Sequence, residues 1–233
     1  MTVFDGHQTR LGVVVIDCQT DDLTEAVGFW EQVFGAPGRI NSRGKYARFG
    51  EYGEHPKMLL QAVDHPPRVH LDFETTDQAA EAARLEGLGA TVVERSDHGW
   101  TVMEAPTGHR FCLVNPQGED WPRDDGSDGG PPPKATLAGL SIDCQDADVA
   151  TAQGFWAAVF GDAERQTPDE TFVRLEPRAG LSIEVQRVDH PSRVHMDFEA
   201  ENVDAEVARF EGFGAAVRAR IHDWVVMEAP AGA

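Results

Sequence analysis

The stretch Val63–Glu74, VDHPPRVHLDFE, decides the fold because the chain repeats it almost unchanged at Val188–Glu199, VDHPSRVHMDFE. The two stretches differ only at Pro67/Ser192 and Leu71/Met196. Other repeats follow in the same order: IDCQ at 16–19 and 142–145, GFW at 28–30 and 154–156, and VMEAP at 102–106 and 226–230. A period this long, with strand-like and helix-like patterns inside it, indicates two copies of one fold and not a solenoid of short repeats.

Composition limits the classes of partner. The 233 residues suffice for two domains that each bury a core. The 20 Lys+Arg and 40 Asp+Glu give an acidic protein of formal net charge -20, so we expect no nucleic-acid and no membrane partner. No apolar run reaches about 18 residues, and the N-terminus lacks the basic-then-apolar order of a signal peptide. We therefore expect a soluble, cytoplasmic protein whose three cysteines are reduced thiols.

The repeat also sets the domain limits. We predict a first domain over 10–117, a Gly/Pro/Asp-rich linker over 118–135 and a second domain over 136–233. The second copy has no counterpart of 111–116, so we expect its last strand to be missing. A monomer with paired domains and a homodimer are both compatible with the repeat.

Hydrophobic periodicity predicts the elements of the first copy. LGVVVIDC at 11–18 is strand-like, and the apolar face of 23–35 indicates a helix that Asp21 or Asp22 caps and Gly35 ends. A second helix is expected over 77–86, and strands are expected at 47–51, 57–63, 68–74, 91–95, 100–105 and 111–114. The order is βαβββ twice per copy. It predicts an α+β fold, because two helices are too few to cover both faces of a sheet.

Strand alternation separates the core from a cavity. In 68–74, Val69, Leu71 and Phe73 point to one face while His70 and Asp72 point to the other. The same alternation sets Cys112 opposite its apolar neighbours and puts Asp17 on the face of Val15. We expect a half-barrel sheet with helices on its convex face and a polar concave face that binds a small molecule.

Several motifs in this order resemble one known superfamily. The βαβββ order, the helix that carries GFW, the VHLDFE strand and APTGHRFCL at 105–113 are similar to the vicinal oxygen chelate superfamily. More narrowly, they resemble its glyoxalase-like domain branch, which includes bleomycin-resistance-like proteins, here as two tandem copies. The resemblance implies the fold and leaves the activity open, since one fold hosts many functions.

The resemblance also implies a metal site with four inward-facing positions, typically His or Gln, Glu, His and Glu. Those positions fall on Val15, Gln61, His70 and Cys112 in the first copy, and on Ser141, Gln186 (or Glu184) and His195 in the second. Val15 and Ser141 are not useful ligands, and Cys112 stands where the family has Glu. We therefore predict no metal and no cofactor. Weak divalent-ion binding, of Zn(II) by His, Cys and Gln with Asp17 as an oxygen ligand, is the alternative.

The candidate ligand-binding residues lie on the concave faces or at their rims: Asp17, Gln61, His70, Trp100, Cys112, Asp143, Gln186, His195 and Trp224. If a reaction is catalysed, His70 is the best candidate for the catalytic group. The alternative for His70 and His195 is a structural imidazole paired with a carboxylate, either the one two residues later or Asp17 and Asp143. Asp17 and Asp143 either face the pocket or cap strand ends, and Trp100 and Trp224 either roof a pocket or pack in the core.

Three functions are compatible with these residues. The first is metal-independent binding of a small polar or cationic metabolite, stronger in the first copy than in the second. The second is a metal-dependent lyase, isomerase or dioxygenase of the glyoxalase type, with His70 as base or ligand. The third is a non-catalytic structural or interaction module.

Overall fold

The computed structural model describes residues 2–4, 6–49, 56–116, 135–145, 149–161, 164–166, 172–176 and 181–230. The chain divides into two compact units, and each unit combines segments of both sequence copies. Unit 1 comprises Met1–Val14, His70–Trp121 and Ala138–Asp197, and unit 2 comprises Val15–Val69, Pro122–Leu137 and Phe198–Ala233. The domain limits drawn from the repeat stay a prediction. The predicted linker lies outside the described residues except for its last residue, Ala135.

The first copy follows the predicted order of elements. It forms β1 (Thr2–Phe4), β2 (His7–Gln19), α1 (Thr24–Phe34), β3 (Gly38–Ile40), β4 (Tyr46–Phe49), β5 (Lys57–Val63), β6 (Arg68–Thr75), α2 (Gln78–Gly87), β7 (Thr91–Arg95), β8 (Trp100–Glu104) and β9 (Arg110–Val114). Two short strands, β1 and β3, were not predicted. The strand β1 pairs antiparallel with β2, and β3 pairs antiparallel with β4 and completes the first βαβββ module.

The second copy repeats this order as far as its second hairpin. It forms β10 (Ala135–Gln145), α3 (Val149–Phe160), β11 (Glu164–Gln166), β12 (Phe172–Glu176), β13 (Ser182–Val188), β14 (Arg193–Ala200), α4 (Val203–Gly212), β15 (Ala216–Ile221) and β16 (Trp224–Glu228). No strand follows β16 in the part of the chain that the structure describes. None of the described helices has the length and apolar composition that crossing a membrane requires.

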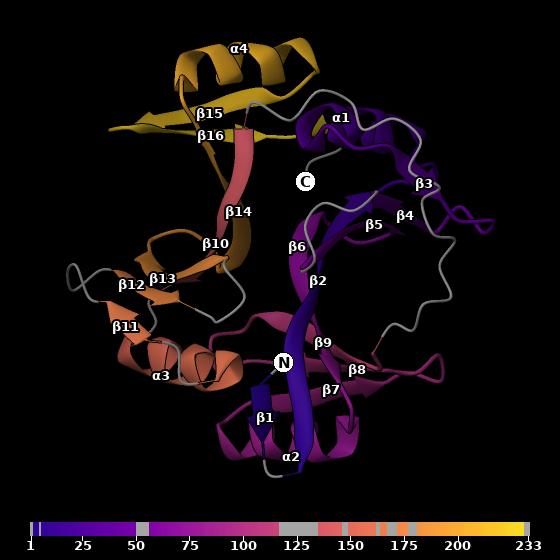
Figure 1. Cartoon of the computed structure of the whole chain (residues 1–233), viewed down its shortest axis with the longest axis vertical. Helices are drawn as coiled ribbons and strands as arrows, with labels where there is room; N and C mark the ends of the chain where they lie inside the picture. Colours follow the sequence, from indigo (N-terminus) through magenta and orange to yellow (C-terminus); the bar gives the residue numbers. More distant parts are fainter. Residues whose placement is uncertain are drawn as a thin grey trace. The chain divides into compact units, whose positions relative to one another are not determined.

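The sheets are open and carry their helices on one face, which confirms the α+β class. In unit 1, the first copy's strands hydrogen-bond in the order β2-β6-β9-β8-β7, and the second copy's in the order β11-β12-β13-β10-β14. In unit 2 the orders are β3-β4-β5-β2 and β15-β16. The helix α2 packs against β7, β8 and β9, and α4 packs along the β15–β16 hairpin (Figure 1).

Both ends of α1 follow from its flanking residues. The Asp22 carboxylate accepts hydrogen bonds from the Thr24 backbone N–H (2.9 Å) and hydroxyl (2.6 Å), while Leu23 occupies the cap position without a side-chain bond. Asp22 therefore stabilises the first turn as predicted, from one residue further out. Gly35 ends the helix with φ of 64°, a left-handed conformation that glycine adopts without steric cost.

Burial along β6 and β9 confirms the predicted faces. Leu71, Phe73, Phe111 and Leu113 are almost fully buried, and Phe73 and Phe111 meet edge to face with ring centroids 5.8 Å apart. Cys112, between the two buried residues of β9, points to the opposite, polar face and is half-buried. The core thus lies on the apolar face of these strands, and the other face is left for polar side chains.

A pair of repeat-related arginines joins the copies inside each unit. In unit 1, Arg84 of α2 binds Glu81 and donates to the Ala158 backbone carbonyl in the last turn of α3 (3.2 Å). In unit 2, Arg209 of α4 donates to the Gln32 carbonyl in the last turn of α1 (2.8 Å). Because each positive guanidinium meets the negative end of a helix dipole, these contacts favour the pairing of segments from different copies.

Candidate functional site

In unit 2, the predicted residue Asp17 is a buried carboxylate near the end of β2, 1% exposed. Arg68 donates to its Oδ2 through Nε at 3.0 Å, and His65 Nε2 lies 3.7 Å from the same oxygen. Cys18, the next residue, faces the core, where burial raises the pKa of its thiol to about 11. Alternation therefore gives β2 one acidic side chain bound to Arg68 and one inert thiol at adjacent positions.

In unit 1, three side chains of the first copy converge on the polar face of β6 and β9. His70 and Asp72 alternate along β6, and Cys112 lies opposite Asp72 in the parallel pairing with β9. The imidazole Nε2 is 3.4 Å from Asp72 Oδ1, and one ligand atom from each of the three residues lies within 4.8 Å of the others. We call His70, Asp72 and Cys112 the first-copy cluster.

The electrostatics of the first-copy cluster keep its thiol neutral. Burial raises the pKa of Cys112 most, the hydrogen bond with His70 lowers it in part, and the charge of Asp72 raises it again. The His70 side chain is 8% exposed and that of Asp72 16%. The cluster can therefore offer an imidazole, a carboxylate and an uncharged thiol to a molecule on this face.

The second copy builds a denser network in unit 1 around Asp143 of β10, which is fully buried. Its Oδ1 accepts from Gln186 Nε2 at 2.6 Å, and its Oδ2 accepts from Arg193 Nε at 3.0 Å. His195 lies between two carboxylates, with Nε2 3.4 Å from Asp143 Oδ1 and Nδ1 3.1 Å from Asp197 Oδ1. We call Asp143, Gln186, Arg193, His195 and Asp197 the second-copy network.

The two carboxylates fix the charge of His195. Burial alone would lower the pKa of this imidazole, but hydrogen bonds and charge from Asp143 and Asp197 outweigh it and raise the pKa to about 9. Burial would raise the pKa of Asp143, yet His195, Gln186 and Arg193 together lower it to about 2. The raised pKa therefore favours an imidazolium at His195, which forms ion pairs with both carboxylates.

Sequence reasoning missed several partners in these groups. Arg68 and Arg193 hold the buried carboxylates, although both belong to the repeated RVH motif that singled out the histidines. His190, in the turn before Arg193, lies 3.5 Å from Asp143 Oδ2. Ser141 donates to Asp197 Oδ2 at 2.7 Å. The repetition of Arg in both copies was the signal that could have found the first two.

His109 supports the second-copy strands from the first copy. Its Nε2 lies 3.0 Å from the Asp143 carbonyl and 3.2 Å from the Arg193 carbonyl, and its Nδ1 lies 2.7 Å from Thr107 Oγ1. Burial lowers the pKa of this imidazole. A neutral His109 that donates from Nε2 and accepts from the Thr107 hydroxyl satisfies all these contacts. The residue holds the backbone of β10 and β14 next to the network.

The remaining predicted residues lie apart from these groups. Gln61 lies on β5 opposite Tyr46 in the ladder of unit 2. Trp100 begins β8 opposite Val114, and its ring lies 5.5 Å from that of His98. Trp224 of unit 2 is 56% exposed, with its ring 5.8 Å from that of His222. No contact described within unit 1 joins Trp100 to the first-copy cluster.

The metal positions implied by the superfamily do not fit in either copy. Val15 is fully buried and offers no ligand atom, and Cys112 is an uncharged thiol where a carboxylate would bind. In the second copy, Ser141 and His195 are already held by Asp197. A different set of donors, the first-copy cluster, does bring three potential ligand atoms together.

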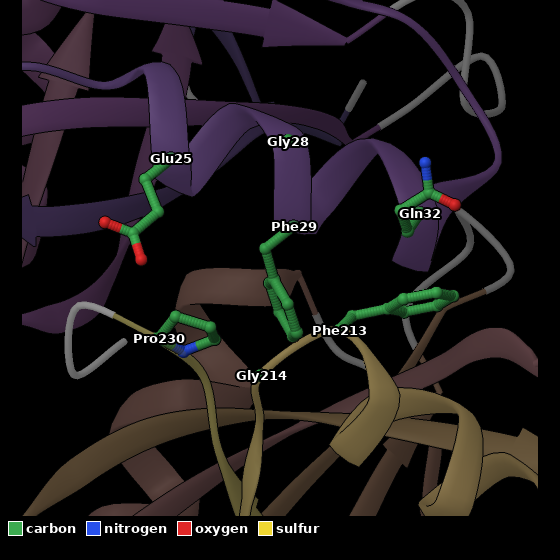
Figure 2. Close-up of a pocket in the computed structure, with 7 residues that line it drawn as sticks. All are labelled: Glu25, Gly28, Phe29, Gln32, Phe213, Gly214 and Pro230. Carbon is green, nitrogen blue, oxygen red and sulfur yellow. The ribbon is translucent and has the colours of Figure 1, made fainter.

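A separate pocket lies in unit 2, away from the residues predicted for the site. Its volume is about 410 Å³, and it is lined by Glu25, Gly28, Phe29, Gln32, Phe213, Gly214 and Pro230. Figure 2 shows the Phe29 side chain of α1 pointing between Phe213 and Pro230. No sequence pattern had pointed to this pocket.

Comparison with known proteins covers both copies. The family model described as "Glyoxalase-like domain" matches residues 13–114 and again 139–233. No curated protein matches the sequence.

Solved structures resemble almost the whole chain. A 2,2',3-trihydroxybiphenyl 1,2-dioxygenase from Sphingomonas wittichii strain RW1 gives a TM-score of 0.60 at 20% identity, over 96% of this chain and 88% of that one. The 2,3-dioxygenase LapB from Pseudomonas sp. KL28 gives 0.59 at 17% identity, over 96% and 89%. A Mn(II)-bound glyoxalase from Novosphingobium aromaticivorans gives 0.59 at 15% identity, over 97% and 81%. At such identities the likeness shows the fold alone.

Proposed function

This chain belongs to the glyoxalase-like domain family of the vicinal oxygen chelate superfamily, and from that premise we propose that it binds a small polar or cationic molecule without a metal ion. The binding site is the first-copy cluster. The observation that carries the proposal is the convergence of His70, Asp72 and Cys112 within 4.8 Å on the polar face of the sheet. Such a convergence of a few polar groups is what fixes the orientation of a ligand in a pocket.

The three groups define the chemistry of the ligand. Asp72 accepts hydrogen bonds and attracts a positive charge, the His70 imidazole can donate a hydrogen bond through a ring N–H, and the Cys112 thiol is a weak donor. A hydroxyl or ammonium group next to Asp72 and an acceptor next to His70 complement this set. The net charge of -20 adds a long-range attraction for cations.

The thiol argues for binding without a metal. Thiolates, not thiols, bind metal ions, and the raised pKa of Cys112 keeps it protonated at neutral pH. An ion would therefore have to displace that proton. The buried Val15, at the superfamily's first metal position, supplies no further ligand.

The second copy is proposed to bind more weakly. Its side chains hydrogen-bond to one another, with Asp143 held by Gln186 and Arg193, and Asp197 held by Ser141. A ligand would have to break these bonds, and an unmatched buried partner costs about 1–3 kcal/mol. The two copies thus give a matched pair for experiment.

The proposal is tested by a binding screen on the chelator-treated full-length chain. Amino acids, polyamines, hydroxy acids and polyols are screened by thermal shift, and hits are measured by calorimetry. We expect His70→Ala to weaken a hit at least tenfold and His195→Ala to leave it nearly unchanged. Urea unfolding of both variants separates lost binding from lost folding, because His70 is buried. Equal losses in the two variants, or no hit in the screen, would contradict the proposal.

A second candidate rests on the same cluster. Imidazole, carboxylate and thiolate are all ligands of Zn(II), and three donors can hold a catalytic ion with an open position. Equilibrium dialysis against Zn(II), followed by elemental analysis, separates the two functions. One ion per chain, lost in Cys112→Ser, would favour the enzyme alternative with His70 as ligand.

A further inference from the structure

The pocket in unit 2 has a matching position in unit 1. The repeats pair four of its lining residues with residues of the same type, namely Gly28 with Gly154, Phe29 with Phe155, Gly214 with Gly89 and Pro230 with Pro106. The backbone is alike as well, because Gly89 and Gly214 both have positive φ, 96° and 103°. A Cβ built on either glycine would lie 3.2 Å from the Cγ of its neighbouring proline. The two units therefore offer one scaffold on which side chains can be compared.

The other three lining residues differ between the units. Each of them adds a polar or aromatic group in unit 2, with Glu25 in place of Thr151, Gln32 in place of Ala158 and Phe213 in place of Leu88. Unit 2 thus gains a carboxylate, a carboxamide and a second phenyl ring. These gains concern the groups that contact a ligand, while the frame of the pocket stays the same.

The spacing along α1 places these groups in a row. Glu25, Gly28, Phe29 and Gln32 share one face of the helix, because they lie at positions i, i+3, i+4 and i+7. The step from Glu25 to Gln32 spans about 10 Å along the helix axis. Figure 2 shows Phe29 between these two side chains. A Cβ on Gly28 would meet nothing within 4 Å, so this part of the wall is open.

The charge of the pocket is negative. Of the described residues that line it, Glu25 alone is charged, and no side chain of the described residues binds its carboxylate. The guanidinium of Arg209 lies 5.4 Å from the centroid of the Phe213 ring, but Glu206 accepts from its Nε at 2.8 Å. Because Glu206 balances the charge of Arg209, the Glu25 carboxylate can attract a further cation.

We propose that this pocket binds a small organic cation, an ammonium group carried on an aromatic or aliphatic body. Glu25 attracts the ammonium group, and the rings of Phe29 and Phe213 contact the body and attract the charge. Gln32 hydrogen-bonds to a polar group at the far end. The volume of about 410 Å³ lies within the range of small-molecule sites. The first-copy cluster lies in unit 1, so this site is separate from the one proposed above.

The test compares three probes of similar shape on the ¹⁵N-labelled full-length chain: phenylethylammonium, phenylethanol and phenylacetate. The amide signals of Gly28 and Gly214 report on the pocket, and those of Gly154 and Gly89 report on the matching position in unit 1. We expect phenylethylammonium to shift the first pair saturably and to leave the second pair unchanged. Phenylethanol should bind more weakly because it lacks the charge, and phenylacetate should bind most weakly because Glu25 repels it.

Three variants assign the binding to named residues. Glu25→Gln keeps the shape of the side chain and should weaken phenylethylammonium about threefold to fivefold, as for an exposed ion pair, without weakening phenylethanol. Gly28→Leu should block the binding of both probes, because its side chain fills the open part of the wall. Gly154→Leu, at the matching glycine of α3, should leave the binding unchanged.

The Glu25→Gln comparison decides the outcome even where a leucine variant does not fold. Equal shifts at both glycine pairs, or no saturable shift at Gly28 and Gly214, would overturn the proposal. So would phenylacetate that binds as tightly as phenylethylammonium, or a Glu25→Gln variant that keeps the full preference for the cation.

Discussion

Replacing Asp143 with Asn tests how strongly the second-copy network holds unit 1 together. The substitution keeps the shape of the side chain and removes its charge. An Asn amide can accept one hydrogen bond through its oxygen, but its NH₂ group would then face a donor, either Arg193 Nε or Gln186 Nε2. It also removes one of the two carboxylates that hold the His195 imidazolium.

The pKa of Asp143 gives the magnitude of the expected loss in the free energy of unfolding. A fall from the ordinary value of 3.8 to about 2 means that the folded protein favours the charged carboxylate over the neutral form by about 2 kcal/mol. We expect Asp143→Asn to lower the free energy of unfolding by about 2 kcal/mol at pH 7.

The pH dependence of stability has two arms, a loss of stability at acid pH and a loss of stability at alkaline pH. The stability from Asp143, whose pKa is depressed, is present above pH 3.8 and lost as the pH falls toward about 2. The stability from His195, whose pKa is raised, is complete below pH 6.5 and lost as the pH rises through about 9. Because the His195 side chain is 35% exposed, solvent screening makes its arm the smaller one. The variant should lose the acid arm and flatten the alkaline one.

Urea unfolding at several pH values measures both arms, and Asp17→Asn serves as a matched control. Asp17 is equally buried and also binds an arginine, so its loss tests carboxylate burial without the doubly bound imidazolium. The control should keep the alkaline arm of the parent protein. An Asp143→Asn protein within about 0.5 kcal/mol of the parent, with an unchanged pH profile, would refute the reasoning.

Three further predictions concern thiols, a buried ion pair and glycines. A thiol reagent should label only Cys112 in the folded chain, because the other two thiols are fully buried. The labelling should be slow at pH 7 and faster at higher pH, because the pKa of Cys112 is raised. Rapid labelling of all three cysteines, measured by mass spectrometry, would contradict this. Glu81→Gln should lower the unfolding free energy by about 3 kcal/mol, because Arg84 and His7 both bind Glu81, and by more than Glu206→Gln, because Glu206 binds Arg209 and has no histidine partner among the described residues. Equal losses in urea unfolding would contradict the role of His7. Gly139→Ala should destabilise the protein, because the new Cβ would lie 2.7 Å from the Ser182 carbonyl oxygen. Gly154→Ala in α3 should stabilise it by about 0.5–1 kcal/mol, because its Cβ would meet nothing within 4 Å. Melting temperatures of the two variants that move in the same direction would count against this.

Local patterns predicted most of the strands. The expected strands at 57–63 and 91–95 match β5 and β7, because alternating or β-branched residues sit between turn residues. The strand β3 was missed because its three residues, Gly38–Ile40, include two exposed side chains and show no alternation. Gly38–Ile40 is a strand because it pairs with β4, and the local hydrophobic pattern does not reveal that pairing.

The sequence predicted which strand face carries each candidate residue, but it did not predict which side chains contact one another. Alternation put His70, Asp72 and Cys112 on the polar face, and in the structure one ligand atom from each lies within 4.8 Å of the others. The contact between His109 and the second-copy strands joins residues 34 and 84 positions apart. It depends on how segments of two copies pack inside one unit, and no local period carries that information.

The first-copy cluster is proposed to bind a polar molecule without a metal ion. The most direct measurement is the ¹⁵N chemical shift of the His70 imidazole in chelator-treated, full-length protein, followed while a hit from the binding screen is added. We predict a saturable change in the His70 shifts, with the same midpoint as calorimetry and with little change at His195. His70 shifts that stay constant, or that change only after Zn(II) is restored, would contradict it.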